Sequence, residues 1–141
     1  MDKTGTIIIV EDDKDDQEVF EEILRSLNHP NEIKFFDSGL NAYEYLANTG
    51  DTPFLIISDI NLPKLSGFEL RDKVYNNEQL RLKCIPYLFF TTSINHRDVI
   101  DAYSKSVQGF FIKPNSTSDL KRILSNIINY WQDCTSPNYI K

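Results

Sequence analysis

The chain has 141 residues, 40% of them hydrophobic and 26% charged, a composition typical of one globular domain. Its formal net charge of −6 argues against a protein that binds nucleic acid or an anionic membrane, because both need basic clusters. The two cysteines, Cys84 and Cys134, have no Cys or His at metal-ligand spacing, so we expect free thiols. Without a signal pattern or an apolar run of membrane-spanning length, we expect a soluble, cytoplasmic protein with proteins or cations as partners.

Residues 6–10 form a β-branched apolar run, which predicts a strand buried on both faces of a sheet. The acidic residues Glu11 and Asp12 follow directly. Apolar residues then recur at helical spacing up to Leu27, which predicts an amphipathic helix with acidic residues in its first turn. We expect Asp13, the third acid, to act as an ordinary amino-terminal helix charge.

Residues 33–36 predict a second strand, followed by a helix that Ser38 can cap. Residues 54–57 are again large and apolar and predict a third buried strand, with Asp59 at its carboxyl end. In open parallel α/β sheets this edge is where ligands bind, so Asp59 is a candidate functional carboxylate. The alternative is that Asp59 only caps a helix or turn.

A helix is expected after Ser66, and the polar residues 76–83 predict a loop or a frayed helix end. Residues 85–90 predict the fourth strand. Three hydroxyl side chains follow it: Thr91, Thr92 and Ser93.

Asn95 can cap a short helix whose apolar side carries Val99, Ile100 and Tyr103. Residues 107–112 predict the fifth strand, which ends at the Lys113-Pro114 pair. The last helix begins at residues 116–118 and shows the clearest helical periodicity of the chain, up to Trp131.

Five strands alternating with five helices predict βαβ units and a parallel sheet covered on both faces. The polar residues that directly follow predicted strands would all lie at the carboxyl edge of this sheet. They are Glu11 and Asp12, Asp59, Thr91 and Lys113. Three carboxylates about 5 Å apart repel one another by roughly 3 kcal/mol per pair at an effective dielectric constant of about 20. A cation must offset this repulsion, and Mg²⁺ prefers such oxygen ligands.

These residues could neutralise a phosphoryl group that arrives at Asp59, because Lys113 adds positive charge and Thr91 can donate a hydrogen bond. Each residue also has an ordinary structural explanation. Glu11 and Asp12 could be capping acids, Thr91 a strand-end cap and Lys113 a solvated charge. These separate explanations do not account for their coincidence at one edge.

At these residues the chain resembles the receiver domain of two-component response regulators. The resemblance extends from Thr6 to Trp131 and rests on four motifs. They are the acidic pair in Ile-Ile-Val-Glu-Asp-Asp, the Asp-x-x-x-Pro-x-x-x-Gly pattern of Asp59, Pro63 and Gly67, the hydroxyl of Thr91, and Lys113-Pro114. The resemblance implies a flavodoxin-like, doubly wound sheet with strand order 2-1-3-4-5, an order for which the chemotaxis member of this family is an established example. It implies a receiver domain over residues 1–132, and residues 133–141 are expected to form a loose tail.

The resemblance also implies the chemistry. A sensor histidine kinase or a histidine phosphotransfer protein would pass a phosphoryl group to Asp59. Mg²⁺, or Mn²⁺ in its place, would be held by Asp12, Asp59 and the backbone carbonyl of Asn61, with Glu11 acting through water. The protein would not be an enzyme apart from its own phosphorylation and slow dephosphorylation. Because 141 residues leave no room for an output domain, we expect a single-domain receiver that signals through protein contact or onward phosphotransfer.

The family's switch residues correspond to Thr91 and to Phe110, although Phe110 could equally be a plain core residue. Their movement would alter the face of the fourth helix, fifth strand and fifth helix, where a downstream protein or a second copy could bind. Asn61 and Ser93 flank the site at positions where the family tunes the lifetime of the phosphorylated state. Thr92 also flanks the site, at a position where many family members carry Ala or Gly, so the resemblance implies narrower access to the phosphoryl site. The Lys113-Pro114 bond is expected to be cis.

Other functions remain as alternatives. One is a receiver-like interaction module that is independent of phosphorylation, against which the intact set of site residues argues. Another is a metal-dependent phosphohydrolase that uses Asp13-Lys14-Asp15, but Gln17 stands where that family has Thr or Val. A flavin-binding protein would need a first loop rich in Ser, Thr and Gly, whereas this loop is acidic.

Overall fold

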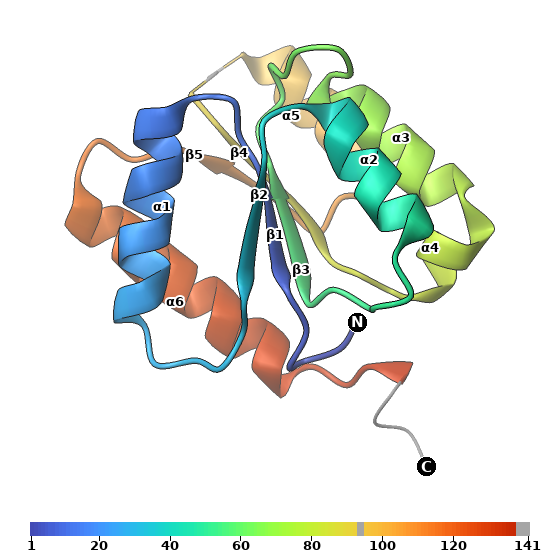
Figure 1. Cartoon of the computed structure of the whole chain (residues 1–141). Helices are drawn as coiled ribbons and strands as arrows, with labels where there is room; N and C mark the ends of the chain where they lie inside the picture. Colours follow the sequence, from blue (N-terminus) through green and yellow to red (C-terminus); the bar gives the residue numbers. More distant parts are fainter. Residues whose placement is uncertain (93–94, 138–141) are drawn as a thin grey trace.

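The computed structural model describes residues 1–92 and 95–137 (Figure 1). Five parallel strands form one sheet in the order β2-β1-β3-β4-β5. The predicted strand order and the doubly wound architecture are therefore confirmed. The strands are β1 (Ile7–Val10), β2 (Ile33–Phe36), β3 (Leu55–Ser58), β4 (Tyr87–Thr91) and β5 (Gly109–Ile112).

Helices cover both faces of the sheet. The described residues form α1 (Lys14–Ser26), α2 (Gly39–Asn48), α3 (Gly67–Asn76), α4 (Glu78–Leu82), α5 (His96–Ser104) and α6 (Thr117–Asp133). Alternate residues of a strand point to opposite faces, so Ile7 and Ile9 contact α1 and α6, while Ile8 and Val10 face the layer of α2 to α5. Figure 1 shows α1 and α6 together on one side of the sheet, with α2, α3 and α4 on the other.

The segment expected to be a loop or a frayed helix end contains the short helix α4. Asn77 caps this helix, because its side chain accepts a hydrogen bond from the backbone N–H of Leu80 at 3.1 Å. Leu80 is only 2% exposed, so its burial stabilises a helix that periodicity over five residues could not reveal. The other five helices correspond to the five expected ones, and the predicted fourth and fifth are α5 and α6.

The buried side of α5 differs from the prediction. Ile100 and Tyr103, expected on its apolar side, are 50% and 54% exposed, whereas Ala102 is fully buried. The small side chain of Ala102 lets α5 pack closely against the β4 and β5 side of the core, and this turns the two larger side chains outward. The exposed fractions of Ile100 and Tyr103 therefore mark an apolar surface on this helix.

The chain after α6 packs onto the body as far as Ser136, and the described residues end at the exposed Pro137. Cys134 packs against the core on the α6 side, and Ser136 is buried. Both cysteines are free, as expected. The boundary of a loose tail at residue 133 stays a prediction. Among the described residues, no helix is long and apolar enough to cross a membrane.

Gly67, the first residue of α3, lies against the backbone that follows β3. Its N–H donates a hydrogen bond to the carbonyl of Ile60 at 2.7 Å. A Cβ at this position would lie 2.1 Å from the carbonyl oxygen of Asp59 and 2.8 Å from the Cα of Ile60. Gly67 is thus required by the close approach of α3 to the Asp59 loop.

We expect Gly67→Ala to lower the free energy of unfolding by about 1–3 kcal/mol, because backbone atoms must move to admit the methyl group. Urea denaturation would measure the loss. Gly50→Ala is the matched control, since nothing lies within 4 Å of a Cβ at that position. Equal stability of the two variants would show that the Asp59 loop tolerates the displacement.

Candidate functional site

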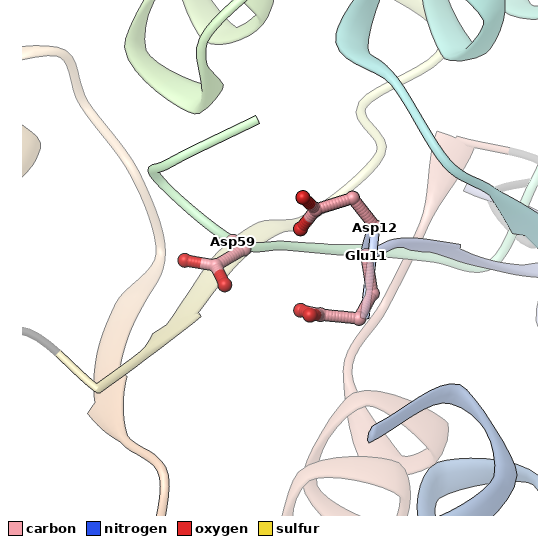
Figure 2. A group of neighbouring side chains, drawn as sticks. All are labelled: Glu11, Asp12 and Asp59. Carbon is pink, nitrogen blue, oxygen red and sulfur yellow. The ribbon is translucent and has the colours of Figure 1, made fainter. Parts of the chain in front are cut away.

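Two strand ends bring three carboxylates together. Glu11 and Asp12 follow β1, and Asp59 follows the neighbouring strand β3. The N–H of Asp59 donates to the carbonyl of Val10 at 3.0 Å, so the hydrogen-bond ladder between these strands fixes both backbones. One oxygen of each carboxylate lies within 4.8 Å of the others. Figure 2 shows the side chains of Glu11 and Asp12 extending toward the side on which Asp59 lies.

Lys113 enters the same site from the end of β5. Its N–H donates to the carbonyl of Thr91 at 2.8 Å, which extends the pairing of β4 and β5 by one step. Its Nζ donates hydrogen bonds to Glu11 Oε2 at 2.9 Å and to Asp59 Oδ2 at 3.1 Å. The predicted convergence of Glu11, Asp12, Asp59 and Lys113 is thus present in the structure.

Asp16 is a further member of the site that sequence reasoning missed. Its Oδ2 accepts a hydrogen bond from Lys113 Nζ at 2.9 Å. The sequence did contain a signal. Because Asp13 caps α1, Asp16 occupies the third helical position, where a side chain leans back toward the amino terminus of the helix and so toward the site.

Burial controls the charges of this cluster. Glu11 is only 3% exposed, and burial raises its pKa to about 7, although its hydrogen bond with Lys113 opposes the shift. Burial also disfavours the charged form of Lys113. Its hydrogen bonds to Glu11 and Asp16 and the charge of Asp59 outweigh this effect, so the pKa of Lys113 lies above its ordinary value. Lys113 therefore remains an ammonium ion at neutral pH.

The backbone holds the second oxygen of Asp59. Asp59 Oδ1 accepts a hydrogen bond from the N–H of Ile60 at 2.6 Å and a longer one from the N–H of Asn61 at 3.4 Å. With Oδ2 on Lys113, both oxygens of this carboxylate are oriented at the open edge of the sheet. The side chain itself is 12% exposed, so a partner can reach it.

The Lys113-Pro114 bond is trans, and the expectation of a cis bond was wrong. The trans form is the default, favoured at bonds before proline by about 0.5–1 kcal/mol. Lys113 already reaches three carboxylates with this geometry, so no cis bond is needed to position its ammonium group.

The remaining predicted residues surround the cluster. Thr91 is the last residue of β4 and is fully buried, whereas Thr92 and Asn61 are exposed. Phe110 is half-buried, with its ring 6.3 Å from that of Phe89. Ser93 lies outside the described residues.

Asp13 has the helix role that was expected of it. Its Oδ1 accepts hydrogen bonds from the N–H groups of Asp15 and Asp16 at 2.9 and 3.1 Å, which makes it the cap of α1. This contact directs the carboxylate of Asp13 to the helix end rather than to the cluster around Asp59.

The cluster fits a hard divalent cation. It offers three carboxylates, of which Glu11 is buried, Asp59 is half-buried and Asp12 is exposed. Asp12 forms no ion pair with any residue in the described ranges, so its carboxylate stays available to a cation. Carboxylate oxygens with room for water are the surroundings that Mg²⁺ prefers.

Comparison with known proteins identifies relatives. A family model described as the response regulator receiver domain matches residues 7–125. The response regulator Rcp1 of Synechocystis is 33% identical over 130 residues, which cover 89% of this chain and 87% of Rcp1.

Solved structures have the same fold. The phosphorylated cyanobacterial phytochrome response regulator RcpA superimposes with a TM-score of 0.83 and 32% identity, covering 94% of this chain and 97% of RcpA. The Mn²⁺-bound form of Rcp1 superimposes with a TM-score of 0.82 and 32% identity, covering 94% of this chain and 98% of the Rcp1 chain. A third structure is the receiver domain of the sensor histidine kinase PA1611 from Pseudomonas aeruginosa, with a magnesium ion in its active-site cleft. It superimposes with a TM-score of 0.71 and 25% identity, covering 88% of this chain and 97% of the PA1611 chain.

Replacing Glu11 with Gln should flatten the pH dependence of stability in the metal-free protein. The pKa of Glu11 is about 7 in the folded protein, against an ordinary value of 4.5. The folded protein therefore holds the extra proton between these values, so its stability falls as the pH rises from about 4.5 to about 7. A shift of this size corresponds to roughly 3 kcal/mol.

Urea denaturation at several pH values, with a chelator present, would measure this slope. Glu18→Gln, at an exposed position of α1, is the matched control and should keep the wild-type slope. If Glu11→Gln also kept the wild-type slope, the burial of Glu11 would not be the cause of the pH dependence of stability.

Proposed function

Since the chain belongs to the response regulator receiver family and is a phosphorylation-dependent receiver of two-component signalling, we propose that Asp59 is the residue that accepts the phosphoryl group. One observation carries the assignment. Within the Glu11–Asp12–Asp59 cluster, Asp59 is the carboxylate that both contacts Lys113 Nζ, at 3.1 Å, and can be reached from outside. Its side chain is 12% exposed, whereas that of Glu11 is 3% exposed, and Asp12 forms no ion pair among the described residues.

In this proposal, an oxygen of Asp59 attacks the phosphorus of a phosphohistidine on a sensor kinase or phosphotransfer protein. A P–O bond forms as the P–N bond breaks, and the imidazole leaves with the electron pair of that bond. Lys113 is charged at neutral pH and binds a phosphoryl oxygen, while the hydroxyl of Thr91 donates a hydrogen bond to another. The same groups support slow hydrolysis of the acyl phosphate by water.

The cofactor is Mg²⁺, which Mn²⁺ can replace, as metal-bound relatives indicate. When bound, the ion neutralises the negative charge that builds up between the incoming phosphate and the carboxylates. We assign its direct protein ligands as Asp12, Asp59 and the backbone carbonyl of Asn61, with Glu11 acting through water. Glu11 is already bonded to Lys113, which fits this less direct role.

The output surface is assigned to α5, β5 and α6. Ile100 and Tyr103 on α5 and Ile112 on β5 are large apolar side chains between 46% and 54% exposed. Thr91 lies on the strand next to β5, and Phe110 lies on β5 itself, so a change at the phosphoryl site reaches this surface directly. A downstream protein or a second copy of the chain would bind there, in the cytoplasm.

The phosphohydrolase alternative is not favoured. Its proposed nucleophile, Asp13, is occupied by the two helix N–H groups that it caps. A phosphorylation-independent module would not require a lysine that is only 11% exposed and that contacts three carboxylates, which is the arrangement found.

Incubation with acetyl phosphate and Mg²⁺ should add the mass of one phosphoryl group to the intact protein, and Asp59→Asn should abolish the adduct. Asp51→Asn, an exposed aspartate outside the site, is the matched control and should be phosphorylated like the wild type. An adduct on Asp59→Asn at the wild-type level would refute the assignment.

Asp12→Asn should weaken Mg²⁺ binding by at least about tenfold, because a hard-cation site loses one of its three carboxylates. Isothermal titration calorimetry would measure the dissociation constant. Asp13→Asn removes a neighbouring charge but preserves the helix cap, since Asn caps as well as Asp. If both variants weakened binding equally, the effect would be one of general charge and not of ligation.

A further inference from the structure

A pocket of about 310 Å³ lies at the opposite edge of the sheet from Asp59. Its walls come from α3, α4, the segment before β4, the turn before β5, and Trp131 of α6. The short helix α4 forms one wall through Leu80 and Arg81. The volume is at the lower end of the range for ligand sites, so it suits a small molecule.

Two arginines line this pocket, and they differ from the other three in the chain. Arg25, Arg97 and Arg122 each pair with a carboxylate on their own helix. Within residues 1–92 and 95–137, neither Arg71 nor Arg81 forms an ion pair. The protein carries a net charge of −6, yet the two arginines without a carboxylate partner line the same pocket.

Arg71 is the more unusual of the two because it is only 5% exposed. Its Nε donates to the carbonyl of Lys105 at 3.0 Å, and its Nη2 donates to that of Ser106 at 2.8 Å. A guanidinium group has five N–H donors, so these bonds leave three of them for another acceptor. Burial lowers the pKa of Arg71, which reflects the cost of holding this charge away from water.

Arg81 completes the cationic side of the pocket. The guanidinium carbons of Arg71 and Arg81 lie 5.4 and 5.7 Å from the centroid of the Tyr75 ring, so both cations face one aromatic side chain. Arg81 Nη1 donates to the carbonyl of Tyr75 at 2.9 Å, which holds it beside the pocket. Arg71 binds the carbonyls of Lys105 and Ser106 at the carboxyl end of α5, so these two contacts are explained by helix capping. Capping does not explain why a second arginine without an ion pair, Arg81, lines the same pocket.

We propose that this pocket binds a small organic anion, either a carboxylate or a phosphate monoester, with an apolar body. The anionic group would accept hydrogen bonds from Arg71 and Arg81. A guanidinium group binds carboxylates and phosphates alike, because its N–H donors can contact two oxygens at once. The apolar body would lie against Val74, Leu80 and Ile85, which line the pocket and are buried. This site is separate from Asp59 and does not depend on its phosphorylation.

Trp131 provides the measurement, because it is the one tryptophan of the chain and it lines the pocket. The full chain is titrated with hexanoate, hexyl phosphate and the neutral analogue hexanol while tryptophan fluorescence is followed. A saturable change with hexanoate or hexyl phosphate, and a much weaker one with hexanol, is expected. The two anions separate the carboxylate from the phosphate class.

Arg81→Gln should raise the dissociation constant of the bound anion about tenfold, through the loss of one charge-assisted hydrogen bond. Arg81 is exposed, so the variant is expected to fold. Arg122→Gln is the matched control, since it removes the same charge beside Trp131 in the neighbouring pocket and should leave binding unchanged. Asp59→Asn should also bind as the wild type does.

The proposal would be overturned by the absence of saturation with both anions, by equal binding of hexanol, or by an unchanged dissociation constant in Arg81→Gln. A loss of binding in Asp59→Asn would place the anion at the phosphoryl site and would overturn it as well.

Discussion

The contact on which the site depends is that of the Lys113 ammonium with three carboxylates. Glu11, Asp16 and Asp59 each lie within 3.1 Å of its Nζ, and the lysine side chain is 11% exposed. At a site with so little solvent exposure, carboxylates this close to one another repel strongly. The ammonium group allows them to remain together, and Asp12, which forms no ion pair among the described residues, stays available to a cation. The carboxylates are thus assembled before any ligand arrives, so phosphoryl transfer would need little further rearrangement of the protein.

That assembly is a consequence of the sheet. All five strands are parallel, so the residues after β1, β3, β4 and β5 emerge at one edge. The hydrogen bonds from the N–H of Asp59 to Val10 and from the N–H of Lys113 to Thr91 extend two of these ladders into the site. Side chains separated by up to about one hundred residues are therefore held with the precision of sheet pairing. A shift of one residue in the register of β5 would turn Lys113 to the other face of the sheet.

The features that follow strands were predictable from sequence, and the features that depend on packing were not. Buried strands are continuous apolar runs, so the residue after each run could be assigned to the site edge. Asp16 was missed because its position depends on which acid caps α1. Helix α4 was missed because its stability comes from the burial of Leu80 rather than from periodicity. The outward turn of Ile100 and Tyr103 follows from the small size of Ala102, which only the packed structure shows.

Helix α5 connects the two edges of the molecule. It begins at His96, shortly after Thr91, and its carboxyl end is held by α3, because Arg71 binds the carbonyls of Lys105 and Ser106. The salt bridge between Lys105 Nζ and Asp72, at 2.8 Å, adds a second tie to the same helix. A displacement of the amino-terminal end of α5 would therefore pivot about an anchored carboxyl end. Such a pivot would move the exposed apolar side chains of this helix while the pocket edge stayed in place, which keeps the pocket independent of the phosphoryl site.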